Sequence, residues 1–90
     1  MPTPSLWADL GTYVRTARHR TSRSQSHVAC EIGISQSGYS QIERGRNRPR
    51  PAVLCRLAVV LRTDITEVAR LADYPIETVI ASHMLWRGKQ

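Results

Sequence analysis

The sequence is poor in several residue types, and each shortage excludes a class of protein. It has two cysteines, Cys30 and Cys55, and no phenylalanine. Two distant cysteines provide neither a disulfide framework nor a zinc site, so we expect reduced residues that fill small gaps in a helical core. The longest purely apolar run, residues 57–61, is too short to span a membrane. The first ten residues lack the basic start and apolar stretch of a secretory signal, which favours the cytoplasm.

Acidic residues are also scarce. Seven Asp and Glu stand against 13 Lys and Arg, which gives a net charge of +6. Residues 1–50 hold eight arginines and three acids, or +5, whereas residues 51–90 hold five basic and four acidic groups, or +1. A basic excess in one half is typical of a protein with one side that faces a polyanion. Twelve of the 13 basic residues are arginine, whose forked guanidinium suits phosphate and guanine.

No stretch of the chain alternates like a half-buried strand, and the apolar spacing is helical nearly throughout, which predicts an all-α bundle. Ser24 and Ser35 are placed to cap a second and a third helix, and Gly33 and Gly45 to end them. The first helix should begin near a Ser5 cap. Its expected buried face consists of Leu6, Leu10, Val14 and Ala17, with Tyr13 beside them.

The second half of the chain predicts three further helices. Pro51 suits the first turn of a fourth helix, whose apolar stripe runs to Leu61. Asp64 and Glu67 have the spacing of a capping box for a fifth. Pro75 starts a short sixth helix that ends before Gly88. We therefore expect a five-helix domain over residues 1–74 and a C-terminal helical extension over residues 75–90.

The predicted third helix has two unlike faces. At roughly 100° per residue, its apolar side holds Tyr39 and Ile42 with one acid, Glu43, at the margin. The opposite side offers amides, hydroxyls and a guanidinium, which are the groups that read base edges in DNA. A helix face that only meets water favours Glu and Lys, so a contact surface is preferred over a merely polar one. The polar side consists of Gln36, Ser37, Ser40, Gln41 and Arg44.

The second and third helices have the spacing of a helix-turn-helix. Ala29 is small where two helices approach closely, and Gly33 can adopt the left-handed conformation of a sharp turn. Apolar residues on both helices lock them at a steep angle. This arrangement predicts that the third helix enters the major groove of double-stranded DNA.

The segment "SQSHVACEIGISQSGYSQIERGRNRP" resembles the helix-turn-helix core of Xre-family regulators, relatives of lambda-type phage repressors and Cro. The resemblance covers about Leu10 to Tyr74 and implies a compact five-helix lambda-repressor-like domain. The sequence departs from the family at Ser22 and Arg23, which replace a glycine and an apolar residue. The matched positions are Ser24–Gln25, Ala29, Gly33–Ser35, Glu43, Gly45 and Pro49.

The resemblance also implies roles for individual residues. Base contacts are expected from Gln36, Ser37, Ser40 and Gln41, and phosphate contacts from Gln25, Arg44, Arg46 and Arg48. Arg18 is expected to pair with Glu43, which agrees with the cost of burying an acid alone. Arg23 either lays its apolar stem on the protein or adds a phosphate contact. Gly38 either allows close approach to DNA or fits under a neighbouring helix.

The function predicted from these features is sequence-specific DNA binding, as a dimeric repressor on a palindromic operator. One recognition helix gives a small interface, so the C-terminal helix is expected to help form a homodimer. The alternative is an antitoxin-like module that grips a protein partner with that helix. The three histidines have no metal-like spacing. We therefore expect no enzyme activity, no metal and no cofactor.

Overall fold

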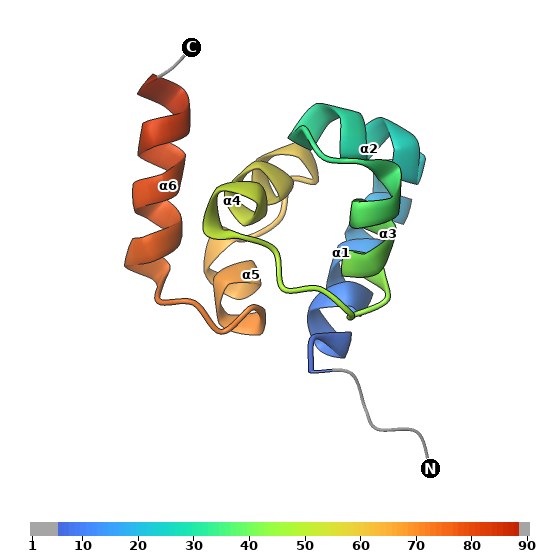
Figure 1. The fold of residues 1–90 in the computed structure, drawn as a ribbon, viewed down its shortest axis with the longest axis horizontal. Helices are drawn as coiled ribbons and strands as arrows, with labels where there is room; N and C mark the ends of the chain where they lie inside the picture. Colours follow the sequence, from blue (N-terminus) through green and yellow to red (C-terminus); the bar gives the residue numbers. More distant parts are fainter. Residues whose placement is uncertain (1–5, 89–90) are drawn as a thin grey trace.

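The computed structural model describes residues 6–88, and side chains as far as residue 82. Within that range the chain is all-helical (Figure 1). No strand occurs among the described residues, which confirms the predicted class. The helices are α1 (Ala8–Arg20), α2 (Gln25–Ile32), α3 (Gln36–Glu43), α4 (Pro51–Val60), α5 (Ile65–Leu71) and α6 (Ile76–Gly88).

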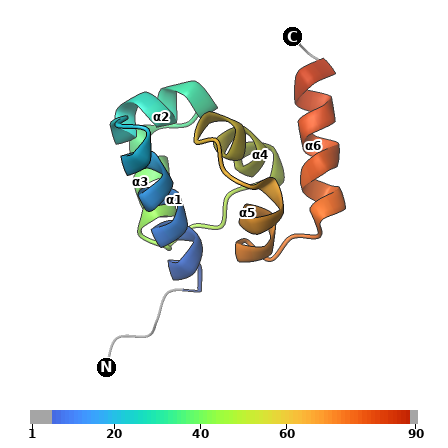
Figure 2. The same ribbon diagram turned by 180° about the vertical axis from the view of Figure 1, so that it is seen from behind.

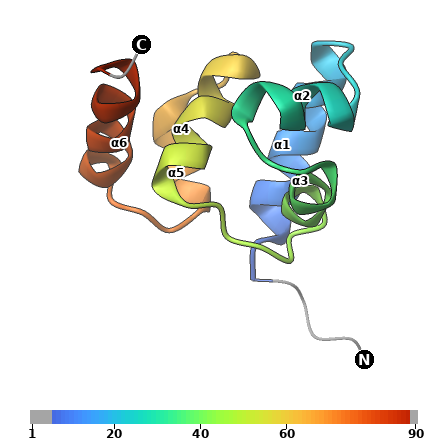
Figure 3. The same ribbon diagram turned by 45° about the horizontal axis from the view of Figure 1, so that its top comes forward.

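The helices are arranged around a central pair, with three helices on one side of it and one on the other. α4 and α5 lie in the middle, α1, α2 and α3 lie on one side of them, and α6 lies on the other (Figures 1 and 2). Figure 3 shows α6 at the opposite end of the molecule from α2 and α3. The outer surface of α3 is therefore remote from α6.

One hydrophobic core joins all six helices. Val14, Val28, Tyr39 and Leu57 are fully buried in it, and Val79 brings α6 into the same cluster. The predicted sixth helix is thus present, but it is part of a six-helix bundle rather than an extension of a five-helix one. At 13 residues α6 is also as long as α1, rather than the short helix expected.

Local side-chain chemistry sets the ends of α2 and α3 as the sequence predicts. The Ser24 hydroxyl accepts a hydrogen bond from the His27 amide at 3.1 Å, and the Ser35 hydroxyl accepts one from the Gly38 amide at 3.0 Å. Each bond satisfies an amide that the helix itself leaves unpaired. Gly33 ends α2 in the left-handed conformation, at φ 77°. The turn between the two helices is therefore short and well defined.

Two predicted core residues lie on the surface. Leu6 is 86% exposed because α1 begins only at Ala8, after Trp7, so Leu6 precedes the apolar stripe of the helix. Ser5, the expected cap, lies outside the described residues. Cys30 is exposed on α2, whereas Cys55 is fully buried on α4. Only the second cysteine fills a gap in the core.

The predicted capping box at α5 is half formed. The Asp64 carboxylate accepts a hydrogen bond from the Thr66 amide at 2.9 Å, as expected of a cap. Glu67 instead forms an ion pair with Arg70, one turn further along the same helix. An arginine three residues away competes for the carboxylate that the motif would direct back to the start of the helix.

A glycine that the sequence pattern does not single out sets the crossing of α1 and α3. A Cβ atom on Gly11 would lie 2.4 Å from the Glu43 carbonyl oxygen and 2.8 Å from that of Ile42. These neighbours are backbone atoms, which cannot rotate away. Glycine at position 11 therefore permits the close contact between the two helices.

We predict that Gly11→Ala destabilises the protein although alanine is the better helix former. Overpacking against backbone should cost about 2 kcal/mol net, which outweighs the propensity gain. Thermal unfolding monitored by circular dichroism should show a midpoint lower by roughly 8–16 °C. Thr12→Ala, at an exposed neighbouring position of α1, is the control and should be nearly neutral. Equal stability of both variants would contradict the close crossing.

Candidate nucleic-acid interface

α3 is held by its apolar side, and its polar side faces outward. Tyr39 is fully buried and Ile42 is 3% exposed, so both fasten the helix to the core. Gln36 and Ser37 are exposed at its start, and Ser40 and Gln41 are partly exposed further along. The four predicted base-reading residues thus lie along one accessible flank. No other described segment covers this flank.

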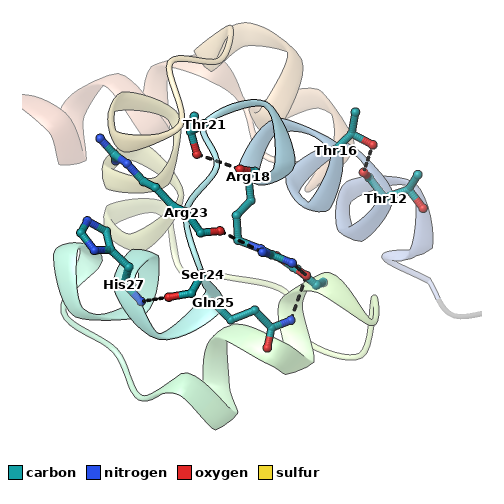
Figure 4. Close-up of polar contacts among 9 residues, drawn as sticks. Thr12, Thr16, Arg18, Thr21, Arg23, Ser24, Gln25 and His27 are labelled. Carbon is teal, nitrogen blue, oxygen red and sulfur yellow. Dashed lines mark hydrogen bonds and ion pairs between the residues drawn. The ribbon is translucent and has the colours of Figure 1, made fainter.

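An ion pair beneath α3 joins three helices. Arg18 of α1 donates from Nε to Glu43 Oε2 at 2.6 Å and from a terminal nitrogen to Oε1 at 3.2 Å. The two side chains are only 12% and 4% exposed. Gln25, the first residue of α2, donates from Nε2 to the same carboxylate at 2.9 Å. Figure 4 shows Arg18 and Gln25 converging from their two helices.

This network determines the orientation of Gln25. The hydrogen bond to Glu43 holds the Gln25 amide nitrogen, whose second hydrogen remains for another acceptor. Gln25 also stands in the first turn of α2, where backbone N–H groups and the positive end of the helix dipole attract anions. Its role as a phosphate ligand stays a prediction.

Burial and hydrogen bonding act in opposite directions on Glu43. Burial favours the neutral acid, but the hydrogen bonds donated by Arg18 and Gln25 outweigh it, so the pKa of Glu43 is lowered. The Glu43 carboxylate in turn raises the pKa of Arg18 by hydrogen bonding. Burial raises the pKa of the nearby Tyr39 phenol, and the adjacent Glu43 carboxylate adds to the shift. The site therefore contains a stable charged pair beside a neutral phenol.

Like Gln25, two of the arginines predicted to bind phosphate have partners within the protein. Arg23 donates to the Val60 carbonyl at 3.2 Å and pairs with Glu31 at 3.1 Å. Its side chain extends away from that of Gln25 (Figure 4). Arg48 donates from Nε to the Ala72 carbonyl at 2.7 Å. For Arg23 these contacts favour the packing role over the phosphate role.

Arg44 and Arg46 are exposed beyond the end of α3. The structure assigns their guanidinium groups no hydrogen bond or ion pair with another described residue. Both lie beside the polar flank of α3 and carry permanent positive charge. They are available to an external anion.

Arg15 is a candidate that the sequence interpretation missed. It is exposed on α1, one turn before Arg18, and it lines a polar hollow of about 210 Å³. The spacing from Arg18 places both residues on one helix face, and this spacing is the signal that could have identified it. The hollow therefore extends the basic surface from α3 to α1. Its other lining residues are Arg18, Gln25, Ser40, Glu43 and Arg44.

Comparison with known proteins identifies one family model. A model described as a helix-turn-helix domain matches residues 9–71, from the second residue of α1 to the last residue of α5. No curated protein and no solved structure gives a significant match. Among the described residues, no helix is both long enough and apolar enough to cross a membrane.

We predict that Glu43→Gln destabilises the protein by about 3 kcal/mol near neutral pH, because it leaves the Arg18 guanidinium without its counterion. Since the folded pKa of Glu43 is lowered from 4.5, the wild-type advantage is fully present above pH 4.5. It should disappear as pH falls through the folded value. Denaturant unfolding across this pH range measures the difference.

The control for this prediction is Glu67→Gln, which removes a carboxylate from an exposed ion pair on α5. Such pairs contribute little, so its stability should stay close to wild type. If Glu43→Gln unfolds at the same denaturant concentration as wild type at pH 7, the buried pair is not a stabilising contact.

Proposed function

The chain belongs to the helix-turn-helix domain family, and on that basis we propose that it regulates transcription by binding a specific DNA site with α3 in the major groove. The observation that carries this proposal is the accessible flank of α3, which holds short amide and hydroxyl side chains beside unpaired arginines. Side chains of this kind match the donors and acceptors of base edges. The two neighbouring helices, α1 and α2, hold α3 in a fixed orientation.

We assign base reading to the flank of α3 and phosphate binding to its surroundings. Gln36 and Gln41 are suited to adenine, which offers one donor and one acceptor in the major groove. Arg44, Arg46 and Arg15 are placed to neutralise phosphates on the strands beside the helix. The start of α2, with Gln25, supports a further phosphate contact. Ser37 and Ser40 complete the reading surface.

We further propose an Xre-type repressor that acts as a homodimer on a palindromic operator. A single recognition helix reads few base pairs, and two copies related by a two-fold axis would double the site. The surface that supports association is apolar. Val59 of α4 and Ile80 of α6 are 48% and 44% exposed beside a hollow of about 300 Å³.

Selection of bound sequences from a random DNA pool, followed by titration of the preferred site, tests the reading residues. Gln36→Ala and Gln41→Ala should each lose about tenfold in affinity for that site and relax the preference at one position. Arg46→Ala should weaken binding to all sequences and reduce the slope of log affinity against log salt by about one. Unchanged selectivity in both glutamine variants would exclude them as readers.

The environment of Gly38 distinguishes its two predicted roles. A Cβ atom there would meet only the Ser35 hydroxyl, at 3.1 Å, and no other helix among the described residues. The fit under a neighbouring helix is therefore wrong. Gly38 instead opens on a hollow of about 350 Å³, which Asn47, Arg48 and Arg50 also line. We propose that the backbone of a DNA strand approaches Gly38 at this hollow.

Gly38→Ala should then reduce DNA affinity while the protein remains folded, because the added methyl group occupies space that the strand requires. Isothermal titration with the selected site and thermal unfolding of the free protein measure the two effects separately. Thr66→Ala, on the exposed surface of α5 and outside the proposed DNA contacts, is a control for a small surface substitution. Full affinity in folded Gly38→Ala would show that DNA does not approach this position.

A further inference from the structure

The loop that follows α3 contacts Trp7, just before α1, and residues 72–74, just after α5. Arg48 lies at the centre of this attachment. Its Nε donates to the Ala72 carbonyl at 2.7 Å, and a terminal nitrogen donates to the Asp73 carbonyl. The same guanidinium lies 3.8 Å from the ring centre of Tyr74 and 5.3 Å from that of Trp7. We call Arg48 and its contacts with residues 72–74 and Trp7 the Arg48 clasp.

The chemistry of the clasp explains why an arginine occupies this position. Ala72 caps the C-terminus of α5, and Asp73 follows it with a φ of 59°, so the carbonyls there have no partner within the helix. A cation at this end is also favoured by the helix dipole. The flat guanidinium can donate to both carbonyls while it stacks on an aromatic face, which a lysine ammonium cannot reproduce.

Two further contacts fix the loop beside the clasp. The Tyr74 hydroxyl donates to the carbonyl of Pro49 at 2.8 Å. At the other end of the loop, Gly45 packs so tightly against the start of α1 that a Cβ atom would lie 2.7 Å from the Cα of Ala8. Residues 45–49 are thus held at both ends by contacts that involve α1 and the segment after α5.

We infer that Arg48 is a positioning residue, and that it holds the loop so that Arg46 and Arg50 stand beside α3. This inference rests on the proposed DNA binding, and it differs from the expectation that Arg48 itself binds phosphate. Arg46 and Arg50 are exposed, and the structure gives their guanidinium groups no hydrogen bond or ion pair with a described residue. Arg48 is exposed as well, but its Nε and one terminal nitrogen already have carbonyl partners.

Replacing Arg48 by lysine separates the two roles. A phosphate contact mainly requires positive charge, so Arg48→Lys would then bind DNA nearly as well as wild type. The Arg48 clasp requires a planar guanidinium that bonds two carbonyl groups at once, which lysine cannot do. We therefore expect Arg48→Lys and Arg48→Ala to lose affinity for all sequences to a similar extent, about fivefold to tenfold. In the complex Arg46 and Arg50 still reach the phosphates, and the lost affinity is the free-energy cost of ordering the loop, so neither variant should change the salt dependence. Arg46→Ala, the matched control, should reduce the salt slope by about one.

Trp7 provides a readout that does not require DNA. In a Trp86→Phe background Trp7 is the only tryptophan. Loss of the stacked guanidinium should change its fluorescence emission in Arg48→Ala and Arg48→Lys but leave it unchanged in Arg46→Ala. If Arg48→Ala does not fold, the lysine variant and the Tyr74→Phe variant, which removes only the bond to Pro49, provide the test.

The outcomes distinguish the inference from the function on which it rests. Wild-type protein that binds no DNA would refute the proposed function, and the inferred role of Arg48 with it, whereas the Trp7 emission would still establish the contact itself. Wild-type protein that binds DNA, together with an Arg48→Ala salt slope lower by one and full affinity in Arg48→Lys, would make Arg48 a phosphate ligand. That result would overturn the inference alone.

Discussion

The position of α3 depends on the buried pair of Arg18 and Glu43. A carboxylate that is only 4% exposed is costly without a partner, and the guanidinium that α1 supplies offsets this cost at the end of α3. Gln25 adds the start of α2 to the same carboxylate. One acid thereby fixes the relative positions of three helices. The close crossing at Gly11 brings α1 near enough for this pair to form.

Some arginines in the first half of the chain bond to the protein itself and others are exposed, and the net charge does not distinguish the two groups. Arg18, Arg23 and Arg48 bond to carboxylates or carbonyl groups of the protein itself. Arg44 and Arg46 present their guanidinium groups to the exterior. An excess of +5 in residues 1–50 therefore overstates the charge available to DNA. The basic surface is smaller than the composition indicates, but it is concentrated beside α3.

The sequence was sufficient to predict features that depend on a few neighbouring residues. Ser24, Ser35 and Gly33 act within one helical turn of their own position, so their residue types alone predicted the ends of α2 and α3. The apolar spacing of α3 likewise predicted that Tyr39 and Ile42 are buried. The helix-turn-helix follows from these local signals. It lies within residues 9–71, which the family model matches.

Features that depend on distant contacts were not predictable in the same way. Arg48 has the same residue type as Arg46 and lies two positions further along the same loop, and the contacts with residues 72–74 distinguish them. Leu6 continues the apolar spacing of α1, but the helix starts after it, so Leu6 is exposed. Cys30 is exposed and Cys55 is buried, although the residue type alone does not distinguish them. The burial and the partners of these side chains depend on contacts between segments that are distant in the sequence.

The composition of the flank of α3 has a consequence for the conditions under which the protein works. Its amides and hydroxyls are neutral at all ordinary pH values, and its arginines remain protonated far above neutrality. No histidine lies on α3. Because this flank has no histidine, salt concentration rather than mild changes in pH should control how tightly it binds DNA.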